Sequence, residues 1–268
     1  MERPSWIPEG VDVTVPNAAR MYDYALGGSH NFAIDRQTAD QIEQMIPGAK
    51  MNAYANRAFV DRAVRWLATQ GIRQFLDIGS GIPTMGNVHE IVQSIAPDAR
   101  VVYVDIDPVA IAHSKAILAG VQHVRVVQAD LAQAADILHH PDVLDLLDFS
   151  RPVAVLLNAV LHFIPDDAHP EQILGHIHDA IVRGSFLTLS HGTPLPDSSV
   201  AEDVENLRNV YRRTPTSLHI RSPERLRELL TDWEILEPGV VPINEWRPDP
   251  DDFNPPAVGI LAAIARKR

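Results

Sequence analysis

The sequence predicts an α/β protein with a Rossmann-like, doubly wound and mostly parallel seven-stranded sheet, an antiparallel edge strand and an N-terminal helical lid. Three observations lead to this fold class. From Ile72 onward, short β-branched runs alternate with helical patterns. These runs are almost continuously apolar, as parallel strands buried on both faces are. The first run ends in a glycine pair followed by a helical pattern, which is typical of nucleotide-binding α/β proteins.

The predicted parallel strands follow one another at the spacing of βα units. They are IRQFLDI (72–78), RVVYVDI (100–106), HVRVVQA (123–129), PVAVLLN (152–158) and GSFLTLS (184–190). Two more strand candidates, WEILEPGVV (233–241) and AVGILAAIA (257–265), are joined by a segment rich in proline and acid. Because such a segment disfavours a strand, we expect these two to form an antiparallel hairpin with a long loop.

Helices are expected between the strands. Asn87 and Glu90 have the spacing of a capping box, and Asp107–Pro108 reads as an N-cap followed by a first-turn proline. Further helical patterns follow Asp167, run from Val200 to Tyr211 and begin at Ser222–Pro223.

The first seventy residues have helical rather than strand patterns. Asn17 is a candidate N-cap for a helix that Gly27–Gly28 ends, a second helix ends at Pro47–Gly48, and a third runs from Met51 to Gln70. We therefore divide the chain into a helical lid segment, residues 1–70, and a core, residues 71–268, within one compact domain. Tyr22 and Asn31 of the lid are predicted to contact the ligand.

Composition excludes several classes of protein. The 268 residues are 46% hydrophobic and carry a net charge of −12, with no cysteine. An acidic chain disfavours binding to nucleic acid or to an anionic membrane, and the lack of cysteine excludes disulfides and thiolate chemistry. We find no signal peptide, no membrane span and no HExxH-type metal motif, so a cytoplasmic protein without a metal is expected.

The glycine turn narrows the choice of ligand. Gly79 and Gly81 follow the first strand, but Thr84 stands where a dinucleotide fingerprint has its third glycine. Asp77 closes the strand directly before the turn, where it would repel a diphosphate and attract a cationic group. This charge favours S-adenosylmethionine (SAM), which has an amino acid and a sulfonium, over NAD.

Acids also close the next two strands. Asp105 lies at the end of the second strand, where an acid in such folds binds ribose hydroxyls, and Asp130 follows the third strand. The carboxyl ends of parallel strands meet at one edge of the sheet, so a nucleoside site is predicted there.

The motifs LDIGSG, VDIDP, ADL and NAVLHFIPD resemble those of class I SAM-dependent methyltransferases. The whole chain is similar to an actinobacterial family of them with unassigned substrate, most specifically through ARMYDYALGGSHNFAIDR and IPTMGNVHE. The resemblance implies that Gly79, Ser80 and Gly81 line the methionine part of SAM. It implies that the ribose and adenine are held by Asp105, Ile106, Asp130 and Leu131, and that Asn158 and Ala159 lie below the sulfonium.

Histidines and arginines are the remaining candidates. His162 and His191 follow the fourth and fifth strands at the ligand edge, where either can serve as a general base for methyl transfer. Arg20 and Arg57 of the lid are candidates for the SAM carboxylate.

The leading hypothesis is a SAM-dependent methyltransferase that acts on a small molecule. The alternatives are a SAM-binding sensor or partner protein without transfer activity and, less favoured by Asp77 and Thr84, a nicotinamide oxidoreductase. The methyl acceptor and the oligomeric state are not indicated by the sequence.

Overall fold

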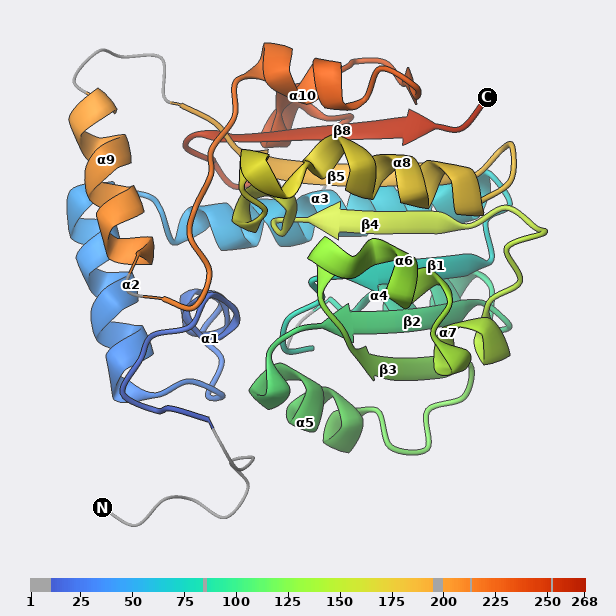
Figure 1. Cartoon of the computed structure of the whole chain (residues 1–268), viewed down its shortest axis with the longest axis horizontal. Coiled ribbons are helices and arrows are strands. Elements are labelled where there is room, and N and C mark those ends of the chain that lie inside the picture. The colour runs from blue at the N-terminus through green and yellow to red at the C-terminus, as the bar shows by residue number, and fades with distance from the viewer. Residues whose placement is uncertain (1–10, 84–85, 195–199, 213, 252) are drawn as a thin grey trace.

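The computed structural model describes residues 11–83, 86–194, 200–212, 214–251 and 253–268. A single mixed sheet runs through the molecule in the order β3-β2-β1-β4-β5-β8-β6, with β7 also paired to β8 (Figure 1). The strands are β1 Gln74–Ile78, β2 Arg100–Asp105, β3 Val124–Gln128, β4 Ala154–Asn158, β5 Phe186–Gly192, β6 Glu234–Ile235, β7 Val241–Pro242 and β8 Ile260–Arg266. The α/β doubly wound fold is confirmed.

The first five strands are parallel and β8 is antiparallel to its neighbours. In detail, β8 lies between β5 and the two short strands β6 and β7, so the antiparallel strand is not itself the outermost one. The predicted strand 233–241 is divided into β6 and β7, which gives eight strands instead of seven. Pro238 and Gly239, with φ 98° at the glycine, interrupt it because proline lacks the donor that a ladder needs.

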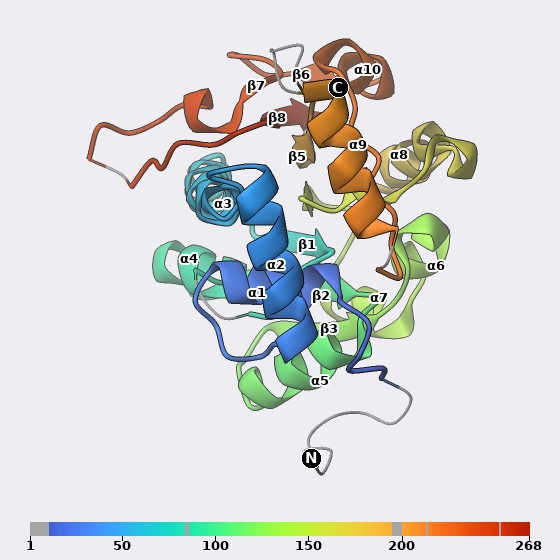
Figure 2. The ribbon, with the colours of Figure 1, turned by 90° about the vertical axis from the view of Figure 1, so that its left-hand side faces the viewer.

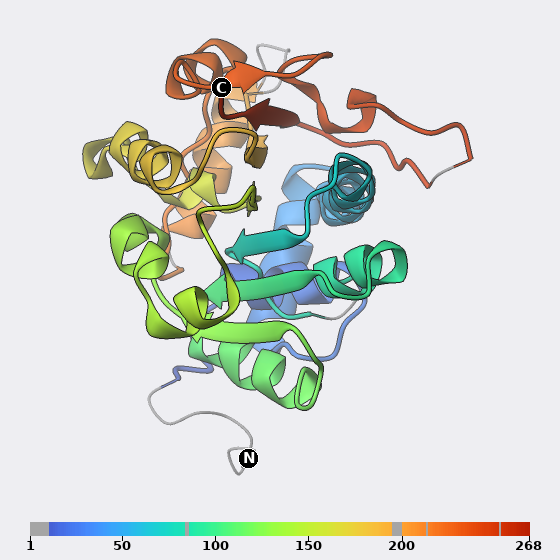
Figure 3. The same ribbon diagram turned by 90° about the vertical axis from the view of Figure 1, so that its right-hand side faces the viewer.

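Helices cover both faces of the sheet. The α-helices of the described residues are α1 Ala18–Ala25, α2 Ala33–Met45, α3 Met51–Thr69, α4 Val88–Ile95, α5 Pro108–Ile117, α6 Ala134–Leu138, α7 Pro141–Leu146, α8 Pro170–Ala180, α9 Val200–Tyr211 and α10 Pro223–Leu229. One face of the sheet packs on α3 and α4 through residues such as Phe59, Phe75 and Val92. The other packs on α6, α7, α8 and α10 through residues such as Leu76, Ile137 and Ile177. Figure 3 shows these layers from the side.

Local signals explain how several helices begin. Asn17 accepts from the N–H groups of Ala19 and Arg20 at the start of α1, and Asn87 and Glu90 form the capping box of α4. Asp107 caps α5 ahead of its first-turn proline. These are the caps that the sequence predicts, because capping depends on residues only two or three positions apart.

The three N-terminal helices lie in two places. Helix α3 packs along the sheet, whereas α1 and α2 stand with α9 beyond the ends of the parallel strands (Figures 1 and 2). Met21, Ile42 and Val210 are the buried contacts that hold α1, α2 and α9 together. In Figure 1 the arrowheads of β2, β3 and β4 point toward these three helices. Among the described residues, no helix has both the length and the hydropathy that spanning a membrane requires.

Candidate functional site

A cavity of about 780 Å³ lies where the parallel strands end. The sheet order reverses between β1 and β4, and residues just after both strands line the cavity. A doubly wound sheet has its natural crevice at such a switch point, because the two following connections leave in opposite directions. Residues of α1, α2, α3 and α9 form the opposite wall.

The glycine turn after β1 requires glycine for two different reasons. Gly79 has φ 74°, and a Cβ atom there would lie 2.3 Å from Cγ2 of Val160. Gly81 has φ 65°, and a Cβ there would meet no atom within 4 Å. The N–H of Gly79 donates to the Val104 carbonyl oxygen over 2.8 Å, which fixes the turn against β2. The turn is therefore anchored at Gly79 and open toward the cavity at Gly81.

Asp77 and Arg57 both line the cavity and lie close enough to interact electrostatically. Burial raises the pKa of Asp77 to about 7, and the nearby Arg57 guanidinium opposes that rise. The Arg57 Nε is buried and has no hydrogen-bond partner in the part of the chain that the structure describes, while its guanidinium lies over the Tyr22 ring, 5.3 Å from the centroid. An acid and a guanidinium held this way suit a zwitterion, whose ammonium and carboxylate they can bind.

Asp105 stands at the end of β2 and also faces the cavity. Its two carboxylate oxygens accept from the N–H of Gly81 over 2.7 Å and from the N–H of Asp107 over 2.9 Å. Burial nevertheless raises the pKa of Asp105 to about 6, because these two bonds only partly offset desolvation. Each oxygen keeps a further acceptor position, which a pair of ligand hydroxyls can fill.

Several buried polar atoms around the cavity lack a partner within the described residues. They are Arg57 Nε, Ser80 Oγ, Asp107 Oδ2 and Asn158 Nδ2, and all four residues line the cavity. Buried polar groups are nearly always hydrogen-bonded in folded proteins, so atoms that gather unpaired at one cavity are suited to a polar ligand. Donors and acceptors both occur among them, which fits a nucleoside joined to an amino acid.

Comparison with known proteins agrees with a ligand made of a nucleoside and an amino acid. A family model described as "S-adenosyl methyltransferase" matches residues 4–268. The chain belongs to this family. It is similar to a putative methyltransferase from Thermobifida fusca YX, with 41% identity, 98% of this chain and 99% of that chain covered, and a TM-score of 0.88.

A second solved structure supports the assignment of this methyltransferase. It is a DUF574 family protein from Streptomyces avermitilis, 35% identical, with 96% of this chain and 99% of that chain covered and a TM-score of 0.88. An O-methyltransferase family protein from Burkholderia thailandensis shares the fold at 14% identity, with a TM-score of 0.52 over 85% of this chain and 62% of that one. Among curated proteins, none matches the chain.

Most of the predicted cofactor residues of the methyltransferase come together at the cavity. Those that line it are Tyr22, Arg57, Asp77, Gly79, Ser80, Gly81, Asp105, Ile106, Asp130, Leu131, Asn158 and Ala159. Asp130 also accepts from the N–H of Ala132 over 2.9 Å, so it caps the 3-10 turn that follows β3.

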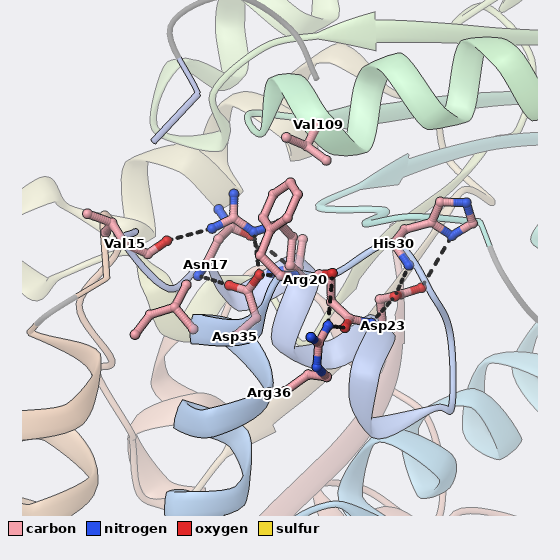
Figure 4. A network of polar contacts seen from close by, with 12 residues as sticks. Val15, Asn17, Arg20, Asp23, His30, Asp35, Arg36 and Val109 are labelled. Atoms are coloured by element: carbon pink, nitrogen blue, oxygen red, sulfur yellow. Dashed lines mark hydrogen bonds and ion pairs between the residues drawn. The ribbon is translucent and has the colours of Figure 1, made fainter. Parts of the chain in front are cut away.

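Arg20 does not line the cavity, in contrast to its predicted role at the SAM carboxylate. Its Nε donates to Asp35 over 2.9 Å and one terminal nitrogen donates to the Val15 carbonyl oxygen over 2.6 Å (Figure 4). Both Arg20 and Asp35 are buried, at 3% and 0% exposure. Arg20 therefore ties α1 to α2, and Asp35 balances its charge.

Asn31 likewise lies outside the cavity lining. Its amide donates to Asp23 and to the Gly28 carbonyl oxygen, and its own oxygen accepts from Arg36. In Figure 4 Asp23 lies beside His30, whose N–H it also binds. Asn31 is thus a structural residue of the loop between α1 and α2, because its polar atoms are all engaged there.

The two histidines proposed as bases are in different situations. His162 lines the cavity, and its Nδ1 accepts from the N–H of Gly192 over 3.3 Å. Burial, with help from His191 and Arg221, holds the pKa of His162 well below its usual value, so the ring is neutral. A neutral ring whose Nδ1 accepts carries its proton on Nε2, which makes Nε2 a donor.

His191 is fully buried and does not line the cavity. Its Nδ1 bonds the Gly192 carbonyl oxygen over 2.7 Å, and its Nε2 accepts from Arg221 over 3.1 Å, since a guanidinium can only donate. Burial lowers the pKa of His191 to about 4. With both nitrogens occupied and no access to the cavity, His191 has a structural role, which corrects its prediction as a base.

Sequence analysis missed Arg221 and His219. Arg221 is 4% exposed and donates to Asp166 and to the carbonyl oxygens of Leu161 and Ile164, so it shapes the loop after β4. His219 lines the cavity, and its N–H donates to the His162 carbonyl oxygen over 2.7 Å. The two basic residues are visible in the segment HIRSP (219–223), but the sequence does not show that the fold brings this segment against the loop after β4.

Proposed function

We propose that the protein transfers a methyl group from SAM to a small-molecule acceptor in this cavity. The observation that carries the proposal is that Asp77 and Arg57 line the cavity beside the open glycine turn, and that the Arg57 Nε has no hydrogen-bond partner among the described residues. Asp105 adds a second acid at the next strand end. Asp77 would bind the amino group of SAM, Arg57 its carboxylate and Asp105 the ribose hydroxyls. Asp130 would accept from the adenine amine, and Ile106, exposed at 50%, would pack on the ring. When bound, SAM supplies an electrophilic methyl group on sulfur.

A proton must leave an oxygen or nitrogen acceptor during transfer, and His219 is our candidate to take it. Its ring forms no hydrogen bond with any described residue, and it lines the cavity. Burial, and then the Arg221 charge, lower the pKa of His219, so an imidazole nitrogen is free to accept at neutral pH. His162, whose Nε2 carries a proton, would instead donate to the acceptor and orient it.

Helices α1, α2 and α9 are proposed to exclude water from the reaction. They form one apolar cluster on the cavity wall opposite the glycine turn. Figure 2 shows the three helices in front of the sheet, on the side that faces the viewer. A shielded cavity strengthens the interactions of Asp77 and Arg57 with a charged ligand, because water screens them less there.

Calorimetry with purified protein tests the cofactor. SAM and S-adenosylhomocysteine are expected to bind, and NADH, used as the matched control, is not. Absence of heat with both sulfur ligands at millimolar concentration would refute the proposal. Label transfer from methyl-labelled SAM into an actinobacterial metabolite extract then distinguishes an enzyme from a binding protein without transfer activity.

A further inference from the structure

The half of the cavity that faces away from the glycine turn has its own chemical character. From this half we infer that the methyl acceptor is an uncharged, mainly apolar ring compound with a hydroxyl or similar group as its polar handle. The inference rests on the proposed function, because it assumes that SAM occupies the half beside Asp77 and Asp105.

Apolar side chains from three helices and one loop build this acceptor half. Met21 of α1, Ile42 of α2 and Leu207 of α9 line it, and all three belong to the cluster that joins these helices. Phe163 and Tyr211 add two aromatic rings with centroids 5.9 Å apart and an interplanar angle of 40°. A wall of this kind favours a flat apolar partner, which can pack on both rings.

No described residue offers an uncompensated charge to this half. Lys50 lines the cavity, but its ammonium lies 2.6 Å from the Asp40 carboxylate and over the Tyr24 ring, 4.7 Å from the centroid. Asp167 is exposed to solvent, so water screens it. A charged acceptor would give up its hydration here without gaining an opposite charge, which is unfavourable.

Polar groups for a single handle are present at the border with the cofactor half. His162 presents a ring N–H, and the Tyr211 hydroxyl makes no hydrogen bond with any described residue although Tyr211 lines the cavity. Burial raises the pKa of Tyr211 to about 12, so its hydroxyl stays protonated and can donate or accept. His219 also lines the cavity, and it is the group that can take a proton from the hydroxyl of the acceptor.

A matched series of naphthalenes tests the inference. The probes are 2-naphthol, 6-hydroxy-2-naphthoate and the corresponding 6-hydroxy-2-naphthylmethylammonium, titrated by calorimetry into protein saturated with S-adenosylhomocysteine. We expect 2-naphthol to bind and each charged relative to bind at least about tenfold more weakly, because neither finds a counter-charge. Equal or tighter binding of a charged relative, or no binding of 2-naphthol at millimolar concentration, would overturn the inference.

Saturation with S-adenosylhomocysteine is measured first, which separates the two proposals. If that ligand fails to bind, the proposed function fails. If it binds and a charged naphthalene is preferred, the acceptor class alone is wrong.

Leu207→Lys provides a second test in the wall itself, with Leu207→Met as the matched control. A lysine at this half-buried position of α9 is expected to weaken 2-naphthol and to strengthen the naphthoate, whereas methionine should leave the order of the three probes unchanged. Melting temperature and S-adenosylhomocysteine affinity are measured on both variants to show that they fold. An unchanged order of probes in folded Leu207→Lys would place the acceptor elsewhere. Tyr211→Phe, which keeps the ring and loses the hydroxyl, should weaken the binding of 2-naphthol, because the hydroxyl of the probe loses a hydrogen-bond partner; unchanged binding would remove the Tyr211 hydroxyl from the acceptor site.

Discussion

Ser190 donates a hydrogen bond to Asn56 over 2.6 Å, although 134 positions separate the two residues in the chain. Asn56 in turn donates to the Tyr22 hydroxyl over 3.0 Å, and Ser190 accepts from the N–H of Ala159 over 2.8 Å. This buried relay links helix α1 to the turn after β4. Ala159 in that turn has φ 55°, a conformation that alanine seldom adopts without such support.

The relay predicts the effect of Asn56→Ala. The substitution leaves the buried Ser190 O–H without its acceptor and removes one of the two partners of the Tyr22 hydroxyl, which still donates to the Ala53 carbonyl oxygen. The free energy of unfolding should therefore fall by about 1–3 kcal/mol. SAM affinity should fall as well, because the Ala159 turn borders the cofactor half of the cavity. Urea denaturation and calorimetry measure the two effects. Tyr22→Phe is the milder control, since it removes only the outer hydroxyl, and equal losses in both variants would argue against a relay.

Asp105→Ala should remove much of the SAM affinity while the fold survives. A carboxylate that binds two hydroxyls contributes roughly 1.5–3 kcal/mol, as charged hydrogen bonds do. Asp98→Ala, at an exposed acid just before β2, is the matched control and should bind SAM normally. If Asp105→Ala binds SAM as tightly as the parent protein, Asp105 has no place in the site.

Asp77 predicts a pH dependence with a definite sign. Its pKa is raised from 3.8 to about 7 by burial, so the folded protein holds a proton that the unfolded chain releases. Its contribution to stability without ligand is therefore greatest at low pH and is lost as pH rises from about 4 to 7. SAM affinity should change in the opposite direction, rising by up to about tenfold per pH unit below pH 7 as Asp77 ionises. Asp77→Asn should make both profiles less steep and leave the part that comes from Asp105, whose pKa burial raises to about 6. Unchanged profiles in that variant would exclude Asp77 as their cause.

The strand ends and the glycine turn could be predicted because their signals are local. Apolar runs ending in Asp77 and Asp105, with Gly79 between them, define a strand, a turn and a partner strand without any long-range information. The caps of α1 and α5 were predicted for the same reason. The strand predicted over 233–241 is divided at Pro238. The prediction gave the apolar residues on either side of Pro238 more weight than the proline itself.

Side-chain partners that are distant in the chain could not be predicted. The sequence does not indicate that Asp35 forms an ion pair with Arg20. It also does not indicate that Arg221 donates to Nε2 of His191. Exposed and buried histidines look alike in a sequence, so His219 was passed over and His191 was chosen. Burial and hydrogen bonding, which depend on the whole fold, decide such cases.

Arg221→Lys tests how the loop after β4 is held. The guanidinium donates to two carbonyl oxygens, to Asp166 and to His191, and an ammonium cannot reach all of them. We expect the free energy of unfolding to fall by about 2 kcal/mol and turnover to fall more than SAM affinity, because the loop carries His162. Arg225→Lys, at a more exposed arginine of α10, is the control. A loss of SAM affinity equal to the loss of turnover would mean that Arg221 supports the whole cavity instead of the acceptor end.

His219→Asn should lower the rate of methyl transfer by about 100-fold or more while SAM affinity is retained, because general bases contribute about 10²–10⁴-fold. The parent rate should fall at acidic pH, below the lowered pKa of His219, and be level near pH 7.

Two further variants separate His219 from the other histidines. His162→Asn should lower the rate of methyl transfer less than His219→Asn does, since asparagine can still donate to the acceptor. His191→Asn should lower the melting temperature without altering the pH profile. Label transfer from SAM measures all three variants against the parent. A full rate in His219→Asn together with complete loss in His162→Asn would move the base to His162, and would require the proton on its Nε2 to shift before each turnover.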